Sequence, residues 1–305
     1  MNQRISVIIP TYNYANAIEA AVESVLQQSA AAAEIIIIDD GSTDNTVDVI
    51  ADLQQRYPDK IHYLQQPNQG PGVARNRGAK EAPGDWLLFL DADDTLLPEA
   101  LSDYQEYLIN NPNINMVYTA HNAVSAEGKT RTKRGKPIAT NNEINFCDYL
   151  LNKTIPLCNG AFIVKKKVFD ALGYAEHMKS AEDICFFAHL LALHPCAYLD
   201  KVTVNIHKHS DSLRHNSRIY RKTALEVCDS VFTDTLPQAL YKYRNEYAAK
   251  RYLSLFRNLY LAGEYQEARA VYHQALRQKP ALLFKLSYLR KYLLSYLRKS
   301  HEATS

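Results

Sequence analysis

From its first residues up to Thr119, the chain alternates between short apolar runs and segments with helical spacing. The runs at 5–9 and 34–38 are rich in β-branched residues and have the length of strands that are buried on both faces. Residues 15–28 lie between them and repeat their apolar side chains at helical intervals. Because strand, helix and strand in this order form a right-handed βαβ unit, we expect an α/β fold, a mixed but mainly parallel sheet flanked by helices. The expected later elements are strands at 61–64, 85–90 and 115–119 and helices at 45–56, 73–80 and 98–108.

Polar loops follow four of the expected strands, at residues 10–13, 39–44, 68–72 and 91–94. They are rich in Asp, Asn, Gly and Pro. In an open α/β sheet, ligands bind outside the carboxyl ends of the strands, so these loops predict a single site at one edge of the sheet.

The last of these loops is the richest in carboxylates. Residues 89–94 read Phe-Leu-Asp-Ala-Asp-Asp, which places three carboxylates within four positions and no Lys or Arg among them. Such a set suits a hard divalent cation that takes its remaining ligands from water and from substrate phosphates. The same residues also fit an ordinary helix start, in which Asp93, Asp94 or Thr95 caps a helix beginning near Pro98. These residues alone leave both interpretations open.

Three further features suit a bound nucleotide. Tyr12 offers a flat ring on which a base can stack, and Asp40 can accept a hydrogen bond from a uracil-type imide. The Gly-Pro-Gly turn at 70–72 brings backbone and Arg75 close to phosphates. Each feature also has a structural reading, as a packed turn residue, a tight turn or a helix cap. Their occurrence together, in this order, favours the nucleotide.

These motifs together strongly resemble the inverting family 2 glycosyltransferases of the GT-A fold. They are Ile-Ile-Pro-Thr-Tyr-Asn at 8–13, Asp-Asp-Gly-Ser-Thr-Asp at 39–44, the loop at 68–78 and Asp-Ala-Asp-Asp at 91–94. The resemblance covers about residues 1–215 and implies a GT-A catalytic domain there. It also implies a nucleotide-sugar donor, usually a UDP-sugar, with Mn²⁺ or Mg²⁺ bridging the diphosphate. The implied acceptor is a glycan or a lipid-linked molecule, as in the synthesis of bacterial cell-surface polysaccharides or glycolipids.

The resemblance carries roles over to individual residues. Asp91 and Asp93 form the Asp-x-Asp pair, and Asp93 is the expected direct metal ligand. The donor-binding positions are Pro10, Thr11, Tyr12, Asp40, Arg75, Asp91 and Ala92.

Glu182 and Asp183 resemble the Glu-Asp motif in which the second acid is the catalytic base. In an inverting transfer, one carboxylate takes the proton of the attacking acceptor hydroxyl while the metal stabilises the departing diphosphate. We assign that role to Asp183 and expect Glu182 to support the acceptor or the loop. The structural alternative is that both acids complement the macrodipole of the helix they begin.

Residues 204–212 resemble the closing segment of the family, an aromatic-Arg-x-His stretch followed by spaced serines. His207 aligns with the motif histidine and would be a metal or diphosphate ligand. Asn205 stands where the arginine is usual, and His209 competes with His207 for the assignment.

Composition agrees with an enzyme of one large domain plus an appendage, since the chain has 305 residues, 47% of them hydrophobic and 22% charged. A formal net charge of +2 argues against a nucleic-acid partner. Five widely spaced cysteines suit reduced thiols in the cytoplasm, and no secretory signal or membrane-spanning run is visible. The single tryptophan, Trp86, excludes the Gln-x-x-Arg-Trp signature of processive synthases, so we expect non-processive transfer of one sugar.

Residues 216–305 are predicted to be helical. Residues 261–280 loosely resemble one tetratricopeptide-type hairpin. Residues 281–299 combine an apolar stripe with five cations and no acid, which is typical of an amphipathic helix lying on an anionic membrane surface, here the inner face of the cytoplasmic membrane. The alternative is a helix packed on the catalytic domain or on a second copy in a homo-oligomer. The stripe is Leu282, Leu286, Leu289, Leu293, Tyr296 and Leu297, and the cations are Lys285, Arg290, Lys291, Arg298 and Lys299.

Two other classes of protein fit parts of the pattern. A nucleotidyltransferase would usually carry a glycine-rich, basic phosphate loop near its amino terminus, but residues 10–14 have neither glycine nor charge. A non-catalytic sugar-binding protein would have lost acids of the site, whereas Asp91, Asp93 and Asp183 are all present. We therefore predict a metal-dependent glycosyltransferase, with donor sugar and acceptor set by residues 121–160.

Overall fold

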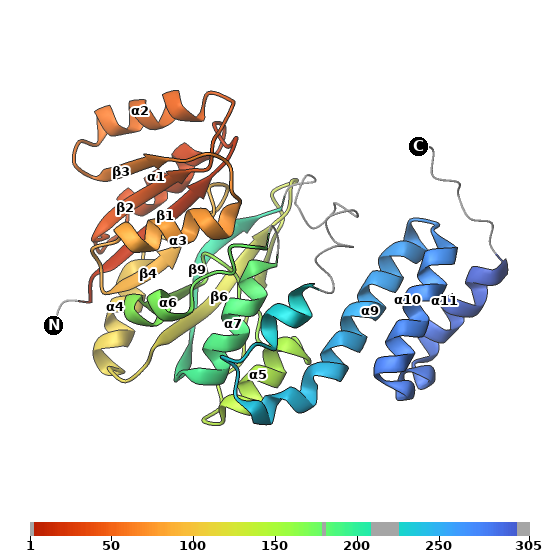
Figure 1. Cartoon of the computed structure of the whole chain (residues 1–305). Helices are drawn as coiled ribbons and strands as arrows, with labels where there is room; N and C mark the ends of the chain where they lie inside the picture. The colour runs from red at the N-terminus through yellow and green to blue at the C-terminus, as the bar shows by residue number, and fades with distance from the viewer. Residues whose placement is uncertain (1–2, 179–180, 209–225, 298–305) are drawn as a thin grey trace. The chain divides into compact units, whose positions relative to one another are not determined.

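The computed structural model describes residues 3–178, 181–208 and 226–297, and it divides into two compact units, Met1–Ser210 and Asp211–Ser305. The domain boundary predicted at residue 215 lies outside the described residues. The first unit is built on a nine-stranded sheet of order β3-β2-β1-β4-β8-β6-β9-β5, with β7 paired to β6 (Figure 1). The predicted α/β class, a mixed sheet flanked by helices, is confirmed.

The amino-terminal half of the sheet is parallel. It comprises β1 (Ile5–Thr11), β2 (Glu34–Asp39), β3 (Ile61–Gln65) and β4 (Trp86–Phe89). The apolar runs that predicted β1 and β2 are fully or almost fully buried, because helices cover both faces. One face packs on α1 (Ile18–Leu26), α2 (Thr46–Arg56) and α4 (Ala100–Asn110). The other packs on α3 (Pro71–Glu81), α6 (Lys166–Leu172) and α7 (Glu182–Leu193).

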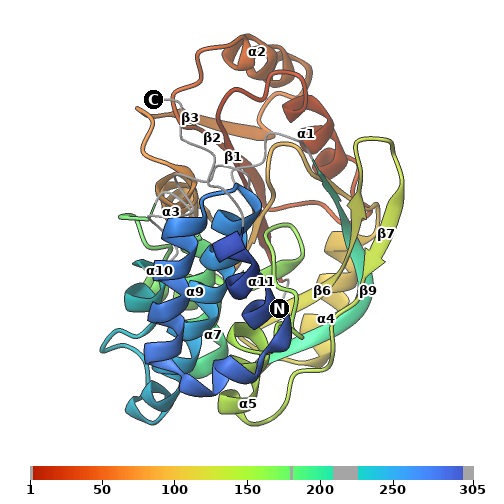
Figure 2. The same ribbon diagram turned by 90° about the vertical axis from the view of Figure 1, so that its right-hand side faces the viewer.

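The second half of the sheet contains antiparallel pairs. β8 (Phe162–Lys165) runs antiparallel to both β4 and β6 (Met116–Val124), so β6 is parallel to β4 and ends at the same edge of the sheet. β9 (Cys196–His207) lies parallel to β6, with register shifts after Thr119 and Ala120. The short β5 (Thr95–Leu96) pairs antiparallel with β9. β7 (Thr130–Lys133) pairs antiparallel with β6 (Figure 2). The loop that holds the three aspartates is therefore joined to β9 through β5.

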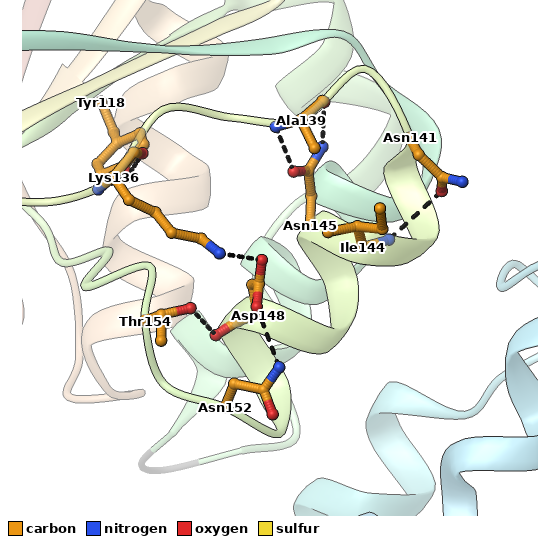
Figure 3. A network of polar contacts seen from close by, with 9 residues as sticks. All are labelled: Tyr118, Lys136, Ala139, Asn141, Ile144, Asn145, Asp148, Asn152 and Thr154. Carbon is orange, nitrogen blue, oxygen red and sulfur yellow. Dashed lines mark hydrogen bonds and ion pairs between the residues drawn. The ribbon is translucent and has the colours of Figure 1, made fainter.

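A polar network fixes the connection between β7 and α5 (Asn142–Leu150), as Figure 3 shows. Lys136 forms an ion pair with Asp148 of α5 and exchanges backbone hydrogen bonds with the Tyr118 hydroxyl of β6. Asn145 binds both backbone groups of Ala139, at 2.8 Å each. Since α5 packs against α7 through the Tyr149–Phe187 edge contact, this network supports the helix that carries the predicted base.

The second unit is helical, as predicted. It comprises η2 (Gln238–Tyr243), α9 (Arg244–Leu261), α10 (Tyr265–Gln278), η3 (Pro280–Phe284) and α11 (Leu286–Leu297). The hairpin predicted at residues 261–280 is wrong in its bounds, because that range holds a single helix, α10, which a three-residue turn joins to α9 before it. α11 packs beside both helices (Figure 2). Aromatic rings fill the centre of this unit, with Phe256 and Tyr272 at 5.2 Å and Tyr272 stacked on Tyr292 at 4.6 Å.

The apolar stripe predicted for residues 281–299 is divided between core and solvent. Leu282 belongs to η3 and is buried in the core of the unit, so it is not part of the final helix as predicted. α11 turns Tyr288, Tyr292 and Ser295 toward that core. Its opposite side is exposed, and the large exposed apolar residues of η3 and α11 are Leu283, Phe284, Leu286, Leu293, Tyr296 and Leu297. Within the described ranges, no helix has the length and apolar character needed to cross a membrane.

Candidate active site

The loop after β1 is tied to the loop after β2. Asn13 adopts a left-handed backbone conformation (φ +59°), which asparagine tolerates better than most residues. Its Oδ1 accepts hydrogen bonds from the backbone N–H of Thr43 (2.7 Å) and of Asp44 (3.3 Å), and its own N–H donates to the Ser42 hydroxyl. Tyr12 is 44% exposed. The structure thus leaves its ring accessible on a fixed loop.

Pro10, Thr11 and Asp40 are buried beside this loop. The Asp40 carboxylate accepts hydrogen bonds from the Gln66 side chain and from the backbone N–H groups of Gln69 (2.9 Å) and Gly70 (2.7 Å). Gly70 has φ +99°, a conformation that glycine adopts without strain, and it precedes the first residue of α3. Asp40 therefore fixes the Gly-Pro-Gly turn, and its contact with a base stays a prediction.

Arg75 of α3 joins two parts of the predicted site. Its guanidinium is 6% exposed and donates to Asp91 Oδ1 at 2.6 Å and to Glu182 Oε1 at 2.7 Å. It also lies over the Tyr174 ring, 5.5 Å from the centroid. The sequence predicted Arg75 at the donor phosphates. The structure places it between the loop after β4 and the start of α7, and a phosphate contact remains a prediction.

Glu182 and Asp183 begin α7, as expected. Ala181, which precedes them, has φ +63°, a strained conformation for a residue with a Cβ. Glu182 is 6% exposed, and a Cβ added at Gly72 would lie 3.2 Å from its Cγ, so glycine at 72 gives this acid its room. Asp183 is half-buried. The two acids thus differ in their surroundings, since the Glu182 side chain is buried against Arg75 whereas the Asp183 side chain is partly exposed.

The aspartate loop concentrates negative charge. Asp91 and Asp93 are half-buried, Ala92 is buried, and Asp94 is 3% exposed. Burial, together with the charges of Asp91 and Asp93, raises the pKa of Asp94 to about 9. Asp94 Oδ1 accepts a hydrogen bond from the backbone N–H of His207 at 2.9 Å. This bond brings the end of β9 to the aspartate loop.

Tyr14 is a member of the site that the sequence did not single out. Its hydroxyl donates a hydrogen bond to Asp93, and burial together with Asp93 and Asp91 raises its pKa to about 12. Its backbone N–H is held by the Thr46 hydroxyl at 3.2 Å. Because Tyr14 lies in a loop that was interpreted for base stacking alone, no local pattern indicated its contact with Asp93.

The residues fit a divalent cation bound together with a diphosphate. Among the described residues there is no cluster of three His, Cys, Asp or Glu side chains arranged as a complete metal site. Two carboxylates plus phosphate oxygens are the set that Mg²⁺ or Mn²⁺ commonly uses. The raised pKa of Asp94 shows the excess negative charge that a cation would neutralise. His207 Nδ1 is buried and has no hydrogen-bond partner within the described part of the chain. His209, the competing histidine, lies outside the described residues.

Asn205, which stands in the place of the expected arginine, has a partner on each side. Its amide accepts from Asn122 Nδ2 of β6 at 3.0 Å and donates to the Thr95 hydroxyl of β5 at 3.5 Å. The position therefore carries an uncharged contact between strands.

The mixed sheet, the polar loops at the carboxyl ends of its parallel strands, and the carboxylates paired with Arg75 at that edge agree with the GT-A fold of glycosyltransferases. The model of "Glycosyl transferase family 2" matches residues 6–173, more than half of the chain, and the protein belongs to this family.

Relatives in sequence and solved structures agree with this family membership. An uncharacterised glycosyltransferase of Nostoc sp. is 52% identical over 98 residues, 32% of this chain and 30% of that protein. A Campylobacter jejuni GalNAc(5)-diNAcBac-PP-undecaprenol beta-1,3-glucosyltransferase is 35% identical over 154 residues, 49% of this chain and 48% of that protein. These matches thus span between about a third and a half of the relatives' own length. The structure of S. aureus TarS 1–349 in complex with UDP-GlcNAc has a TM-score of 0.68 at 22% identity, covering 96% of this chain and 89% of that one, a likeness of fold.

Proposed function

We propose that this protein transfers one sugar from a nucleoside diphosphate sugar, a UDP-sugar, to a hydroxyl of a glycan or lipid-linked acceptor, with inversion at the anomeric carbon. The observation that carries the proposal is the Arg75 bridge. One buried guanidinium binds Asp91 of the donor loop and Glu182, the neighbour of the predicted base. A site for a group transfer needs such a fixed spacing between the leaving group and the base.

Each residue has a role in this proposal. Tyr12 and Asp40 hold the base of the donor, and Asp93, Asp91 and His207 would hold Mn²⁺ or Mg²⁺. The cation, when bound, neutralises the charge that develops on the departing diphosphate. Pro10 and Thr11 at the end of β1, and Ala92 in the aspartate loop, line the donor side of the site.

Asp183 takes the proton from the acceptor hydroxyl as that oxygen attacks the anomeric carbon from the face opposite the diphosphate. Its partial exposure supports this role, because the base must reach an incoming hydroxyl. Glu182 is buried against Arg75 and holds the start of α7 in place.

The donor and acceptor classes rest on similar proteins. The TarS structure contains UDP-GlcNAc, and the Campylobacter enzyme is named for an undecaprenol-diphosphate acceptor. The first supports a UDP-sugar donor and the second a lipid-linked saccharide acceptor, without fixing the sugar.

The experiment is a screen of UDP release from a panel of nucleotide sugars, followed by two variants. Asp183→Asn keeps the shape of the base but not its function, so transfer falls by roughly 10²- to 10⁴-fold while UDP affinity is unchanged. Asp48→Asn, an exposed acid of α2, is the matched control and keeps full activity. Full activity of Asp183→Asn would assign the base to another residue, and no UDP release from any donor would refute the proposed transfer.

We further propose that the second unit lies on an anionic membrane surface at the inner face of the cytoplasmic membrane. The exposed side of η3 and α11 carries the six large apolar residues named above. The sequence from Ala268 to Leu297 contains no acid and includes Lys285, Arg290 and Lys291 around that side. Apolar burial and cations beside acidic headgroups act together at such a surface. A second copy of the chain fits less well, because a symmetric contact would bring the same cations together.

A further inference from the structure

A row of four uncharged polar side chains crosses four neighbouring strands beside the aspartate loop. Register places Thr95 of β5 opposite Asn205 of β9, Asn205 opposite Asn122 of β6, and Asn122 opposite Thr132 of β7. We call these four residues the Asn–Thr row. Thr132 is exposed and the other three are half-buried.

Hydrogen bonds connect the Asn–Thr row from end to end. The Thr132 hydroxyl donates to Asn122 Oδ1 at 2.9 Å, and Asn122 Nδ2 donates to Asn205 Oδ1 at 3.0 Å. Asn205 Nδ2 lies 3.5 Å from the Thr95 hydroxyl. Because each amide is held by a neighbour, the row presents its polar groups in one fixed arrangement, which lowers the cost of ordering them around a ligand.

The row retains unused hydrogen-bonding capacity. A side-chain amide has two N–H donors and two lone pairs on its oxygen. Within the described part of the chain, Asn122 and Asn205 each use one donor and one acceptor through their side chains, and so keep one of each. The row therefore matches a ligand that both donates and accepts, such as vicinal hydroxyls, better than an anion.

The Asn–Thr row is connected to the aspartate loop of the predicted active site. Thr95 follows Asp94 directly in the chain, and β9 binds Asp94 through the backbone N–H of His207. On the opposite side of the same strands, Leu96 and Val204 are buried in the core. The half-buried side that carries the row thus begins at the aspartate loop and extends along β9, β6 and β7. These three strands lie side by side in Figure 2.

We infer that the Asn–Thr row is a binding platform for the hydroxyl groups of a saccharide acceptor. The inference rests on the proposed glycosyl transfer and assigns the acceptor side of that site. A sugar hydroxyl can donate a hydrogen bond to an amide oxygen and accept one from an amide N–H. Each such contact is weak, but several together fix the orientation of the bound sugar.

The test uses protein labelled with ¹⁵N at asparagine and saturated with UDP and Mg²⁺, which is diamagnetic and leaves the amide signals sharp. Methyl glycosides of glucose, galactose, N-acetylglucosamine and N-acetylgalactosamine are the probes, titrated one at a time. We expect the side-chain amide signals of Asn122 and Asn205, assigned from Asn122→Ala and Asn205→Ala, to shift with at least one glycoside. UDP affinity, measured by calorimetry, reports the donor site independently.

Two exposed variants on one strand complete the test. Thr132→Ala removes the outer end of the row and weakens glycoside binding about 5- to 10-fold, as expected for one lost hydrogen bond. Arg131→Ala changes the neighbouring residue, which points to the other side of β7, and leaves binding unchanged. If UDP binds but no glycoside shifts the two amides, or if both variants behave alike, the platform is wrong while the donor site stands. If UDP itself does not bind, the proposed function fails first.

Discussion

Replacing Arg75 tests the link between the two halves of the site most directly. Arg75→Met removes a buried cation that binds Glu182, whose side chain is 8% exposed, and Asp91, whose side chain is 38% exposed. Loss of one partner of a buried pair costs about 3–5 kcal/mol, because the remaining charge is left in a poorly solvating environment. The more exposed Asp91 contact adds at most about 1 kcal/mol. We therefore expect the first unit to lose about 3–6 kcal/mol of its free energy of unfolding.

A double-mutant cycle separates the Arg75–Glu182 pair from other effects of the replacement. Glu182→Gln alone costs about 1–3 kcal/mol, since Arg75 keeps Asp91. The double variant should be more stable than the sum of the two single losses by about 2 kcal/mol, because no buried carboxylate is then left facing an apolar side chain. The coupling energy is therefore the quantity to measure.

Urea unfolding followed by fluorescence is the assay. The only tryptophan, Trp86, lies buried in β4 and reports the first unit. Arg4→Met is the control, since it breaks an ion pair at 3.5 Å whose side chains are 56% and 58% exposed, and its cost should not exceed about 1 kcal/mol. The reasoning is refuted if Arg75→Met is as mild as this control, or if the two single losses simply add.

Four further outcomes are expected. Asp93→Ala should abolish Mn²⁺-dependent binding of UDP, measured by calorimetry. Tyr14→Phe should weaken this binding about 10-fold or more, because the hydrogen bond to Asp93 is lost. Unchanged UDP affinity in either variant would show that the replaced residue does not take part in metal binding. The pKa of Asp94, about 9, lies above its ordinary value, so its contribution to stability is fully present below the ordinary pKa and is lost as pH rises toward 9. In metal-free protein, the free energy of unfolding should therefore fall by up to about 1.4 kcal/mol per pH unit between about pH 5 and 9 relative to Asp94→Asn, and parallel curves would contradict this. The protein should cosediment with vesicles that contain acidic lipid, and the double variant Leu286→Glu/Leu293→Glu should not. Neutral lipid or high salt should also abolish cosedimentation of the unchanged protein. If neither the variant, the neutral lipid nor the salt reduces cosedimentation, the protein does not bind an anionic membrane surface in this way.

Local pattern was sufficient for most of the fold. Continuous β-branched runs predicted β1 and β2, because a strand that is buried on both faces is apolar throughout. Helical spacing predicted the helices between the strands, because a helix that is buried along one side repeats its apolar residues at that spacing. The end of the chain was predicted less well. The stripe that begins at Leu282 reads as one helix, but Pro280 and the residues after it form a separate 3-10 turn that places Leu282 in the core.

The sequence by itself determined the α/β class, the four loops at one edge of the sheet and the acids that belong to the family's motifs. Only the tertiary structure decided which side chains meet. Arg75 reaches Glu182 across 107 positions, Tyr14 reaches Asp93, and Asn205 finds Asn122 and Thr95 on neighbouring strands. The physical reason is that secondary structure follows from the spacing of apolar residues along a few turns, whereas these contacts depend on strand order and register. Strand order and register cannot be inferred from the residues that neighbour a side chain in the sequence.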